Sequence, residues 1–159
     1  MAVTIHVTAA VLDDREWCAT LMVSSEPWIT LGRDVASCRD SLNRPGTDLF
    51  VARNPEDDQL LGFILLAPYG LAGSPYIASI AVAAETRGRG IGSELLRFAE
   101  RHFAGRAHLF LLVSSFNQKA RDLYLRQGYT PVGELKDYCV PGQSELILHK
   151  GLACPSSPR

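Results

Sequence analysis

The alternation of hydrophobic and polar positions along the chain follows two periods, which predict a series of strands and helices. Short runs rich in β-branched and aromatic residues predict seven strands, within residues 3–10, 48–54, 59–68, 76–82, 107–115, 129–140 and 144–150. Apolar residues three or four positions apart predict four helices, within residues 13–25, 33–46, 91–104 and 117–128. The elements therefore follow the order β-α-α-β-β-β-α-β-α-β-β.

The segments between these elements indicate how the strands pair. A polar turn at residues 55–58 joins two strands into a hairpin, and a loop rich in glycine and proline is expected at residues 69–75. The strand-helix-strand unit in residues 76–115 requires one parallel pair. We therefore predict the α/β class, with one mixed and mostly antiparallel sheet that carries helices on both faces.

Residues that commonly begin and end helices support these boundaries. Asp13 or Asp14 is expected to cap the first helix, because a carboxylate accepts hydrogen bonds from free backbone N–H groups. Asn117 is expected to cap the last helix in the same way, and Gly128 is expected to end it.

Composition restricts the class of protein. The chain has 159 residues, 47% of them hydrophobic and 21% charged, which suits one domain in residues 1–152 and a flexible tail in residues 153–159. The formal net charge of −1 argues against a broad surface for nucleic acid or anionic membranes. No apolar stretch is long enough to span a bilayer.

The cysteines and histidines lack the spacing of metal ligands. The four cysteines include no C-x-x-C pair, and the four histidines are scattered along the chain. We therefore expect no metal site, and free thiols in a reducing compartment. The N-terminus lacks the basic and apolar regions of a signal peptide, so a cytoplasmic location is expected.

The stretch ETRGRGIGSELL, residues 85–96, places three glycines and two arginines directly before a predicted helix. Gly88, Gly90 and Gly92 remove side chains that would keep a ligand away from the first N–H groups of that helix. Such a terminus favours phosphate or pyrophosphate. The spacing excludes both the Walker A loop and the G-x-G-x-x-G dinucleotide loop, and a plain tight turn is the alternative to an anion site.

Two motifs in this half of the chain resemble those of one enzyme family. Residues 87–92, RGRGIG, are similar to the Arg/Gln-x-x-Gly-x-Gly/Ala motif of the GNAT family of N-acetyltransferases. The pattern N-x-x-A-x-x-x-Y-x-x-x-G-Y in residues 117–129 resembles the last helix of that family and the strand after it. The likeness is specific over residues 76–129, and before them it rests on the order of the elements.

The resemblance implies a GNAT-like acyl-CoA N-acyltransferase fold, in which the parallel strands splay apart and acetyl-CoA enters the gap. It implies cofactor contacts from the strand, the glycine loop and the last helix: Ile80, Ala81, Val82, Arg87, Gly88, Arg89, Gly90, Ile91, Gly92, Ser93, Asn117 and Tyr124. The amides of the loop would bind the pyrophosphate, and the strand would pair with the pantetheine arm.

The resemblance also implies direct transfer of the acetyl group to a primary amine. Tyr124 stands where the family has a tyrosine directed at the sulfur, so it is expected to be the general acid. Many members have a carboxylate on the strand before the glycine loop, but residues 74–82 contain no Asp or Glu. Glu26 is therefore the expected base, with ordered water as the alternative, and Glu26, Trp28 and Tyr76 are expected to bind the acceptor.

Three further residues are weaker candidates. Asp137 and Tyr138 are placed near the acceptor pocket at the end of a predicted strand. Cys139 could act as a covalent nucleophile, but no histidine accompanies it in a recognisable arrangement, and we do not expect this role.

Other functions remain open at this point. One alternative is a catalytically silent acyl-CoA-binding or sensing module with the same fold, and another is an unrelated nucleotide-binding enzyme. The acceptor can be a small molecule or a peptide or protein N-terminus, and the resemblance leaves a homodimer open. We expect neither nucleic acid nor a membrane as a partner.

Overall fold

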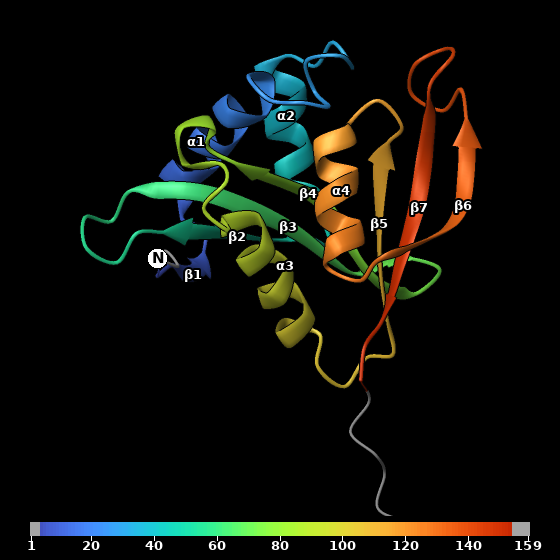
Figure 1. Cartoon of the computed structure of the whole chain (residues 1–159). Helices are drawn as coiled ribbons and strands as arrows, with labels where there is room; N and C mark the ends of the chain where they lie inside the picture. Colours follow the sequence, from blue (N-terminus) through green and yellow to red (C-terminus); the bar gives the residue numbers. More distant parts are fainter. Residues whose placement is uncertain (1–3, 154–159) are drawn as a thin grey trace, which may run out of the picture.

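The computed structural model describes residues 4–153 and confirms the predicted order of strands and helices (Figure 1). The strands are β1 (His6–Ala9), β2 (Asp48–Arg53), β3 (Leu60–Leu71), β4 (Ser74–Val82), β5 (His108–Ser114), β6 (Thr130–Lys136) and β7 (Ser144–Gly151). The helices are α1 (Leu12–Val23), α2 (Val35–Leu42), α3 (Ile91–His102) and α4 (Gln118–Arg126), with a short 3-10 helix, η1 (Ala84–Thr86), before α3. The tail expected at residues 153–159 lies, apart from Ala153, outside the described residues.

One seven-stranded sheet has the order β1-β2-β3-β4-β5-β7-β6. All neighbouring strands are antiparallel except β4 and β5, which are parallel. The predicted α/β class and the mixed sheet are therefore confirmed. Because β7 lies between β5 and β6, the last strand of the chain becomes an internal strand beside β5.

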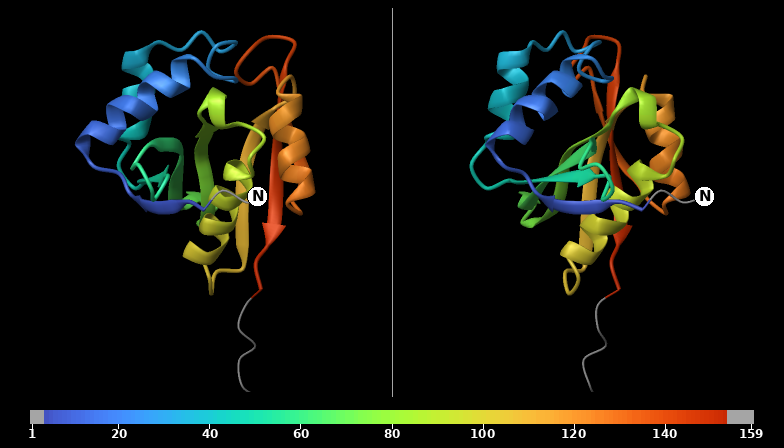
Figure 2. Two further views of the ribbon diagram at one scale, coloured as in Figure 1. Left: turned by 60° about the vertical axis from the view of Figure 1, so that its left-hand side comes forward. Right: turned by 90° about the vertical axis from the view of Figure 1, so that its left-hand side faces the viewer.

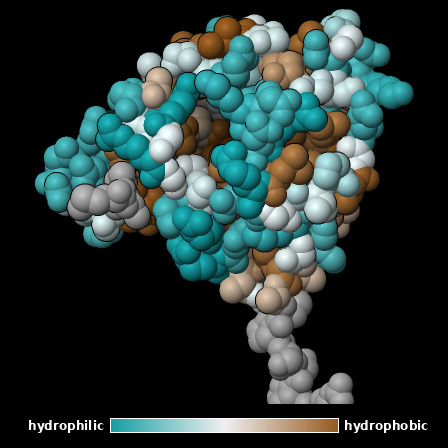
Figure 3. All heavy atoms as spheres, viewed as in Figure 1, coloured by the Kyte–Doolittle hydropathy of each residue, from teal (hydrophilic) through white to brown (hydrophobic). Residues whose placement is uncertain are grey.

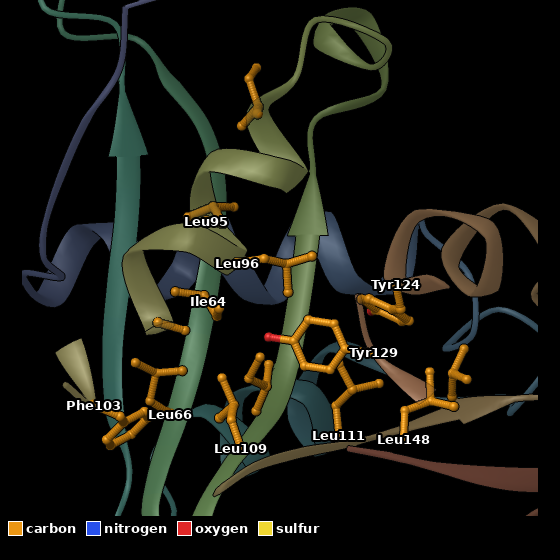
Figure 4. Packing of buried hydrophobic residues seen from close by; sticks show 14 of the residues in the cluster. Ile64, Leu66, Leu95, Leu96, Phe103, Leu109, Leu111, Tyr124, Tyr129 and Leu148 are labelled. Atoms are coloured by element: carbon orange, nitrogen blue, oxygen red, sulfur yellow. The ribbon is translucent and has the colours of Figure 1, made fainter. Parts of the chain in front are cut away.

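Helices α1 and α2 cover one face of the sheet, and α3 and α4 cover the other (Figure 2). On the first face, Met22 of α1 and Leu42 of α2 are almost wholly buried against Phe63 of β3. On the second face, Leu95 of α3 and Tyr129, which follows α4, pack in a second core over the sheet (Figure 4). None of the helices in residues 4–153 combines the length and apolar character needed to cross a membrane.

The connection between β3 and β4 is much shorter than the loop predicted at residues 69–75. β3 continues through Leu71 and β4 begins at Ser74, so that Ala72 and Gly73 alone form the turn, with φ of 49° and 74°. Two-residue turns between twisted antiparallel strands require such positive φ values. The glycine content therefore marked a tight hairpin turn, and its interpretation as a long loop was wrong.

Helix α1 begins at Leu12, two or three residues earlier than a cap at Asp13 or Asp14 would allow. Its N-cap is Val11, whose N–H donates a hydrogen bond to the carboxylate of Asp14 (2.9 Å). Asp14 is buried and also forms an ion pair with Arg53 of β2 (2.6 Å). The carboxylate thus binds the start of the helix from inside its first turn, and the prediction of Asp13 or Asp14 as N-cap was wrong.

Strand β6 ends at Lys136, before the predicted end at Val140. Asp137 has a φ of 52°, and its carboxylate accepts a hydrogen bond from the N–H of Gly142 (2.6 Å). A polar side chain that binds nearby backbone competes with strand pairing. Residues 137–143 therefore form a loop rather than the end of a strand.

Candidate active site

A cleft of about 1160 Å³ opens where β4 and β5 separate. Its walls come from the segment after α1, from β4, from the start of α3, from β5, from α4 and from β7. Figure 3 shows a hollow with an apolar interior and a hydrophilic rim in the region between α3 and α4. The volume lies above the range of roughly 300–1,000 Å³ that is typical of small-molecule sites, so the cleft has room for two substrates.

Strand β4 is paired along one edge and largely open along the other. It pairs with β3 as far as Val82, but with β5 only at Tyr76 and Ile77. Its register against β3 shifts at Ala78, where one extra residue marks a β-bulge. Beyond the bulge, the edge that faces β5 has no strand partner among the described residues. Its backbone groups are therefore free to pair with an extended ligand.

The glycine loop ends at the N-terminus of α3, on the wall of the cleft. Gly88 and Gly90 have φ of 79° and 82°, in the left-handed region that favours glycine, and Gly90 is the N-cap of α3. The first N–H groups of the helix have no acceptor within it. Gly92 has a different role, since a Cβ there would lie 3.0 Å from a methyl group of Leu123, and glycine lets α3 approach α4.

Arg87 folds back over the end of β4. Its Nε donates a hydrogen bond to the carbonyl of Val82 (3.1 Å), and its guanidinium also donates to the hydroxyl of Ser25 (3.4 Å). Its backbone N–H donates to the carbonyl of Ala84 (3.4 Å). Arg87 thus connects the segment after α1, the end of β4 and the glycine loop. Arg89 is exposed and lies outside the lining of the cleft, unlike the other residues for which cofactor contacts are expected.

Helix α4 forms the wall opposite β4. Asn117 caps it, as predicted, by accepting a hydrogen bond from the N–H of Ala120 (3.4 Å). Gly128 follows the C-cap with a φ of 92°, which confirms its predicted place at the end of the helix. Asn117 also lines the cleft, so the residue that begins the helix faces the ligand space.

Tyr124 combines a buried ring with a hydroxyl at the cleft. The residue is 6% exposed, and its ring packs against Tyr129, with 6.2 Å between the ring centroids (Figure 4). No hydrogen bond to its hydroxyl is found within residues 4–153, and no fully buried side-chain polar atom there is unpaired, so the hydroxyl is accessible from the cleft that Tyr124 lines. Burial, and to a smaller extent the neighbouring Tyr76, raises the pKa of the Tyr124 phenol. The phenol therefore keeps its proton at physiological pH.

Glu145 is a buried carboxylate in the cleft that sequence reasoning missed. It is 8% exposed and lines the cleft from β7, where it is paired with Ser114 of β5. The Ser114 hydroxyl donates a hydrogen bond to its Oε1 (2.5 Å). Burial, followed by the negative charge of Glu145, raises the pKa of Tyr76 to about 12. The only sequence signal is a charged residue in the otherwise apolar strand SELIL.

The predicted acceptor-binding residues lie at one end of the cleft. Glu26, Trp28 and Tyr76 all line it. Glu26 is exposed, and its carboxylate accepts hydrogen bonds from the N–H (3.2 Å) and hydroxyl (2.9 Å) of Thr30. The segment after α1 therefore holds Glu26 at the rim, whereas Glu145 lies in the interior.

The loop after β6 contributes only part of what was expected. Tyr138 and Cys139 line the cleft, but Asp137 does not, because its carboxylate binds its own loop. Among residues 4–153, no group of three or more His, Cys, Asp or Glu side chains is suited to hold a metal ion.

Comparison with known proteins agrees with this geometry. The family model of the acetyltransferase (GNAT) family matches residues 9–129. An uncharacterised N-acetyltransferase of Methanocaldococcus jannaschii is 33% identical over 97 residues, which span 59% of this chain and 61% of that protein. The chain thus matches less than two thirds of the length of this relative.

Solved structures share the fold over nearly the whole chain. A protein of Desulfovibrio desulfuricans assigned to the GNAT family superposes with a TM-score of 0.77 at 21% identity, covering 94% of this chain and 100% of its own. An aminoglycoside 6′-N-acetyltransferase complexed with coenzyme A gives a TM-score of 0.75 at 15% identity, covering 96% and 99%. At such identities the likeness shows the fold. Together with the family match, it confirms the resemblance carried by the glycine loop and by residues 117–129, and the chain belongs to the acetyltransferase (GNAT) family.

Proposed function

We propose that the protein transfers the acetyl group of acetyl-CoA directly to a primary amine. The observation that carries this proposal is the open edge of β4, which runs from the bulge at Ala78 to Val82 inside one cleft. The N-terminus of α3 lies at one end of this cleft and the hydroxyl of Tyr124 reaches it from the opposite wall. The related aminoglycoside 6′-N-acetyltransferase, which has the same fold, is complexed with coenzyme A.

The cofactor would be held by backbone rather than by charged side chains. The N–H groups at the start of α3 would bind the pyrophosphate, favoured by the helix dipole. The pantetheine arm of acetyl-CoA would extend along the unpaired edge of β4 as an additional strand. Asn117 would contact the arm from the other wall. Because Arg87 already binds Val82 and Ser25, its part is to hold the loop in place.

The acceptor amine must lose a proton before it can attack the thioester carbonyl. Glu145 is the base that we favour, because it is buried in the cleft and Ser114 orients it. Glu26 remains the alternative, since it lines the same end of the cleft at the rim. Either carboxylate can take the proton directly or through one water molecule.

The remaining steps use backbone and one phenol. The amine forms a bond to the carbonyl carbon, and an amide of the open β4 edge stabilises the oxyanion. When the bond between carbon and sulfur breaks, the sulfur leaves as a thiolate. Tyr124 gives it a proton, which the raised pKa of the phenol has kept in place. The nitrogen still carries one extra proton after the attack and loses it to solvent, and the proton on the carboxylate restores the tyrosine through solvent.

Gly90→Ala is expected to weaken acetyl-CoA binding roughly tenfold. The left-handed conformation of Gly90 costs about 1–2 kcal/mol for a residue with a side chain. In the free protein the loop can relax and avoid this cost. Binding of acetyl-CoA requires the left-handed conformation again, so the cost raises Kd roughly tenfold. Calorimetric titration with acetyl-CoA measures the change.

Gly105→Ala is the matched control for this variant. Gly105 also has a positive φ (92°), a Cβ there would also meet nothing within 4 Å, and it lies outside the cleft. Gly105→Ala should leave the affinity for acetyl-CoA unchanged, whereas Gly90→Ala should bind acetyl-CoA more weakly. Unchanged affinity in Gly90→Ala would contradict the assignment of the loop.

Release of coenzyme A thiol tests the function as a whole. The protein is incubated with acetyl-CoA and a panel of amino acids, polyamines, aminoglycosides and peptides, and free thiol is measured over time. We expect amine-dependent release with at least one class. Tight binding of acetyl-CoA without release on any acceptor would instead favour a silent acyl-CoA-binding module.

A further inference from the structure

A second cavity, of about 450 Å³, adjoins the cleft between α2 and the face of β3 and β4. Trp28, Arg33, Arg44 and Tyr76 line both spaces, so the second cavity begins where the acceptor end of the cleft stops. It lies on the face of the sheet that α1 and α2 cover. A ligand that reaches the thioester from this side would extend into it.

Two positive charges stand at the junction of these spaces. Arg33 lies in the turn before α2 and Arg44 in the turn after it, so one short helix sets their separation. Within residues 4–153, neither guanidinium has a hydrogen bond or an ion pair with a protein group, whereas those of Arg39 and Arg53 are both paired. Both side chains are exposed, so their donors are free to bind an anionic ligand group, and carboxylate fits their fork of donors.

The carboxylate of Glu145 supplies the opposite charge nearby. Burial is the main cause of the raised pKa of Tyr76. The charge of Glu145 raises this pKa further, and the charge of Arg44 lowers it. Glu145 and Arg33 act in the same opposed way on the pKa of Cys139, which burial also raises. Glu145, Arg33 and Arg44 all line the cleft, so its acceptor end has one negative and two positive groups, which is complementary to a zwitterion.

Aromatic and aliphatic side chains form most of the remaining wall of the second cavity. Trp28 and Tyr76 contribute rings, and Leu31 and Leu65 contribute aliphatic surface. Tyr69 also lines the cavity, but it is exposed and the guanidinium of Arg106 lies over its ring (4.9 Å). Leu65 is 2% exposed, so the floor of the cavity is the core itself. Such a lining favours an apolar or aromatic group of the ligand.

We propose that the acceptor is an α-amino acid with a large apolar or aromatic side chain. Its carboxylate binds Arg33 and Arg44, its side chain occupies the second cavity, and its amine faces Glu145. This inference rests on the proposed acetyl transfer. Glu145 takes one proton of the ammonium group, the new bond joins the nitrogen to the acetyl carbon, and the bond from that carbon to sulfur breaks. Tyr124 protonates the thiolate, and the second proton of the nitrogen passes to solvent.

Matched acceptors test the proposal on the unaltered protein. Phenylalanine, tryptophan, leucine and methionine are each compared with the corresponding amide and the decarboxylated amine, and kcat/KM is measured by thiol release. We expect the free amino acids to be preferred about tenfold or more, the size of one charged hydrogen bond. Equal rates for amino acid and amide would overturn the proposal but leave the acetyl-transfer function standing. No release with any acceptor of the wider panel would remove that function as well.

Arg33→Gln and Arg44→Gln test the residues. Each should raise KM for the preferred amino acid about tenfold and leave KM for its amide unchanged. Arg101→Gln removes the same charge from α3, outside both cavities, and should change neither value. If the two cavity variants affect amino acid and amide equally, the arginines do not bind the carboxylate and the proposal fails.

Discussion

Replacement of Tyr124 by phenylalanine is expected to lower turnover about 100-fold or more, with little change in the affinity for acetyl-CoA. The ring packs in the core beside Tyr129, and phenylalanine preserves that packing (Figure 4). Only the hydroxyl is lost, and it has no hydrogen bond to another described residue. The thiolate then leaves without a positioned proton donor. Single-turnover kinetics and calorimetric binding of acetyl-CoA separate the two quantities.

Tyr129→Phe is the matched control for this experiment. Tyr129 is equally buried, but it lies outside the lining of the cleft, and its hydroxyl donates a hydrogen bond to Glu100 (3.4 Å). Its loss should lower the free energy of unfolding by about 1 kcal/mol and leave turnover unchanged. Full activity in Tyr124→Phe would remove the general-acid assignment. An equal loss in both variants would show that packing, not proton transfer, was disturbed.

Glu145→Gln is expected to reduce turnover about 100-fold or more near neutral pH, with the loss shrinking as the pH rises. Glutamine keeps an acceptor for the Ser114 hydroxyl and a similar shape, but it cannot take a proton from the amine. At higher pH a larger share of the acceptor is already neutral, so the base is needed less. A pH profile of kcat/KM from about pH 6 to about pH 9 measures this recovery.

The raised pKa values of two phenols, Tyr76 and Tyr124, simplify the interpretation of the pH profile of this variant. Burial raises the pKa of Tyr76 to about 12 and that of Tyr124 further still, so both phenols keep their protons across the measured range. A change in the profile therefore reports on the amine and its base. Glu26→Gln is the companion variant, and it should retain most of its turnover. A reversed result, with the large and pH-dependent loss in Glu26→Gln, would move the base to the rim of the cleft.

Local sequence patterns determined the order of the strands and helices and several of their ends. The two periods of hydrophobic residues predicted the seven strands and four α-helices in order, because each element needs an apolar face of its own period, but they did not predict the short 3-10 helix η1. The requirement of a strand-helix-strand unit for a parallel pair placed β4 beside β5. The predicted cap of α4 at Asn117 and its end at Gly128 are confirmed. These features depend on neighbours within a few residues, so the sequence displays them directly.

The boundaries of helices and strands were harder to predict from the sequence where local interactions compete. The hydrogen bonds of the Asp14 and Asp137 carboxylates moved the start of α1 and the end of β6 from their expected places. In both cases a side chain binds backbone nearby, and composition alone does not show which of several polar residues will do so.

The side chains that line the cleft were determined by contacts between distant parts of the chain. Glu145 reaches the interior only because β7 inserts between β5 and β6, which sets it against Ser114, 31 residues earlier in the chain. Arg33 and Arg44 meet the cleft only because α2 packs over β3 and β4. The sequence by itself thus determined the family, the glycine loop and the tyrosine at the cleft. Only the tertiary structure decided which buried carboxylate and which arginines line the cleft, since those contacts join residues with no shared local pattern.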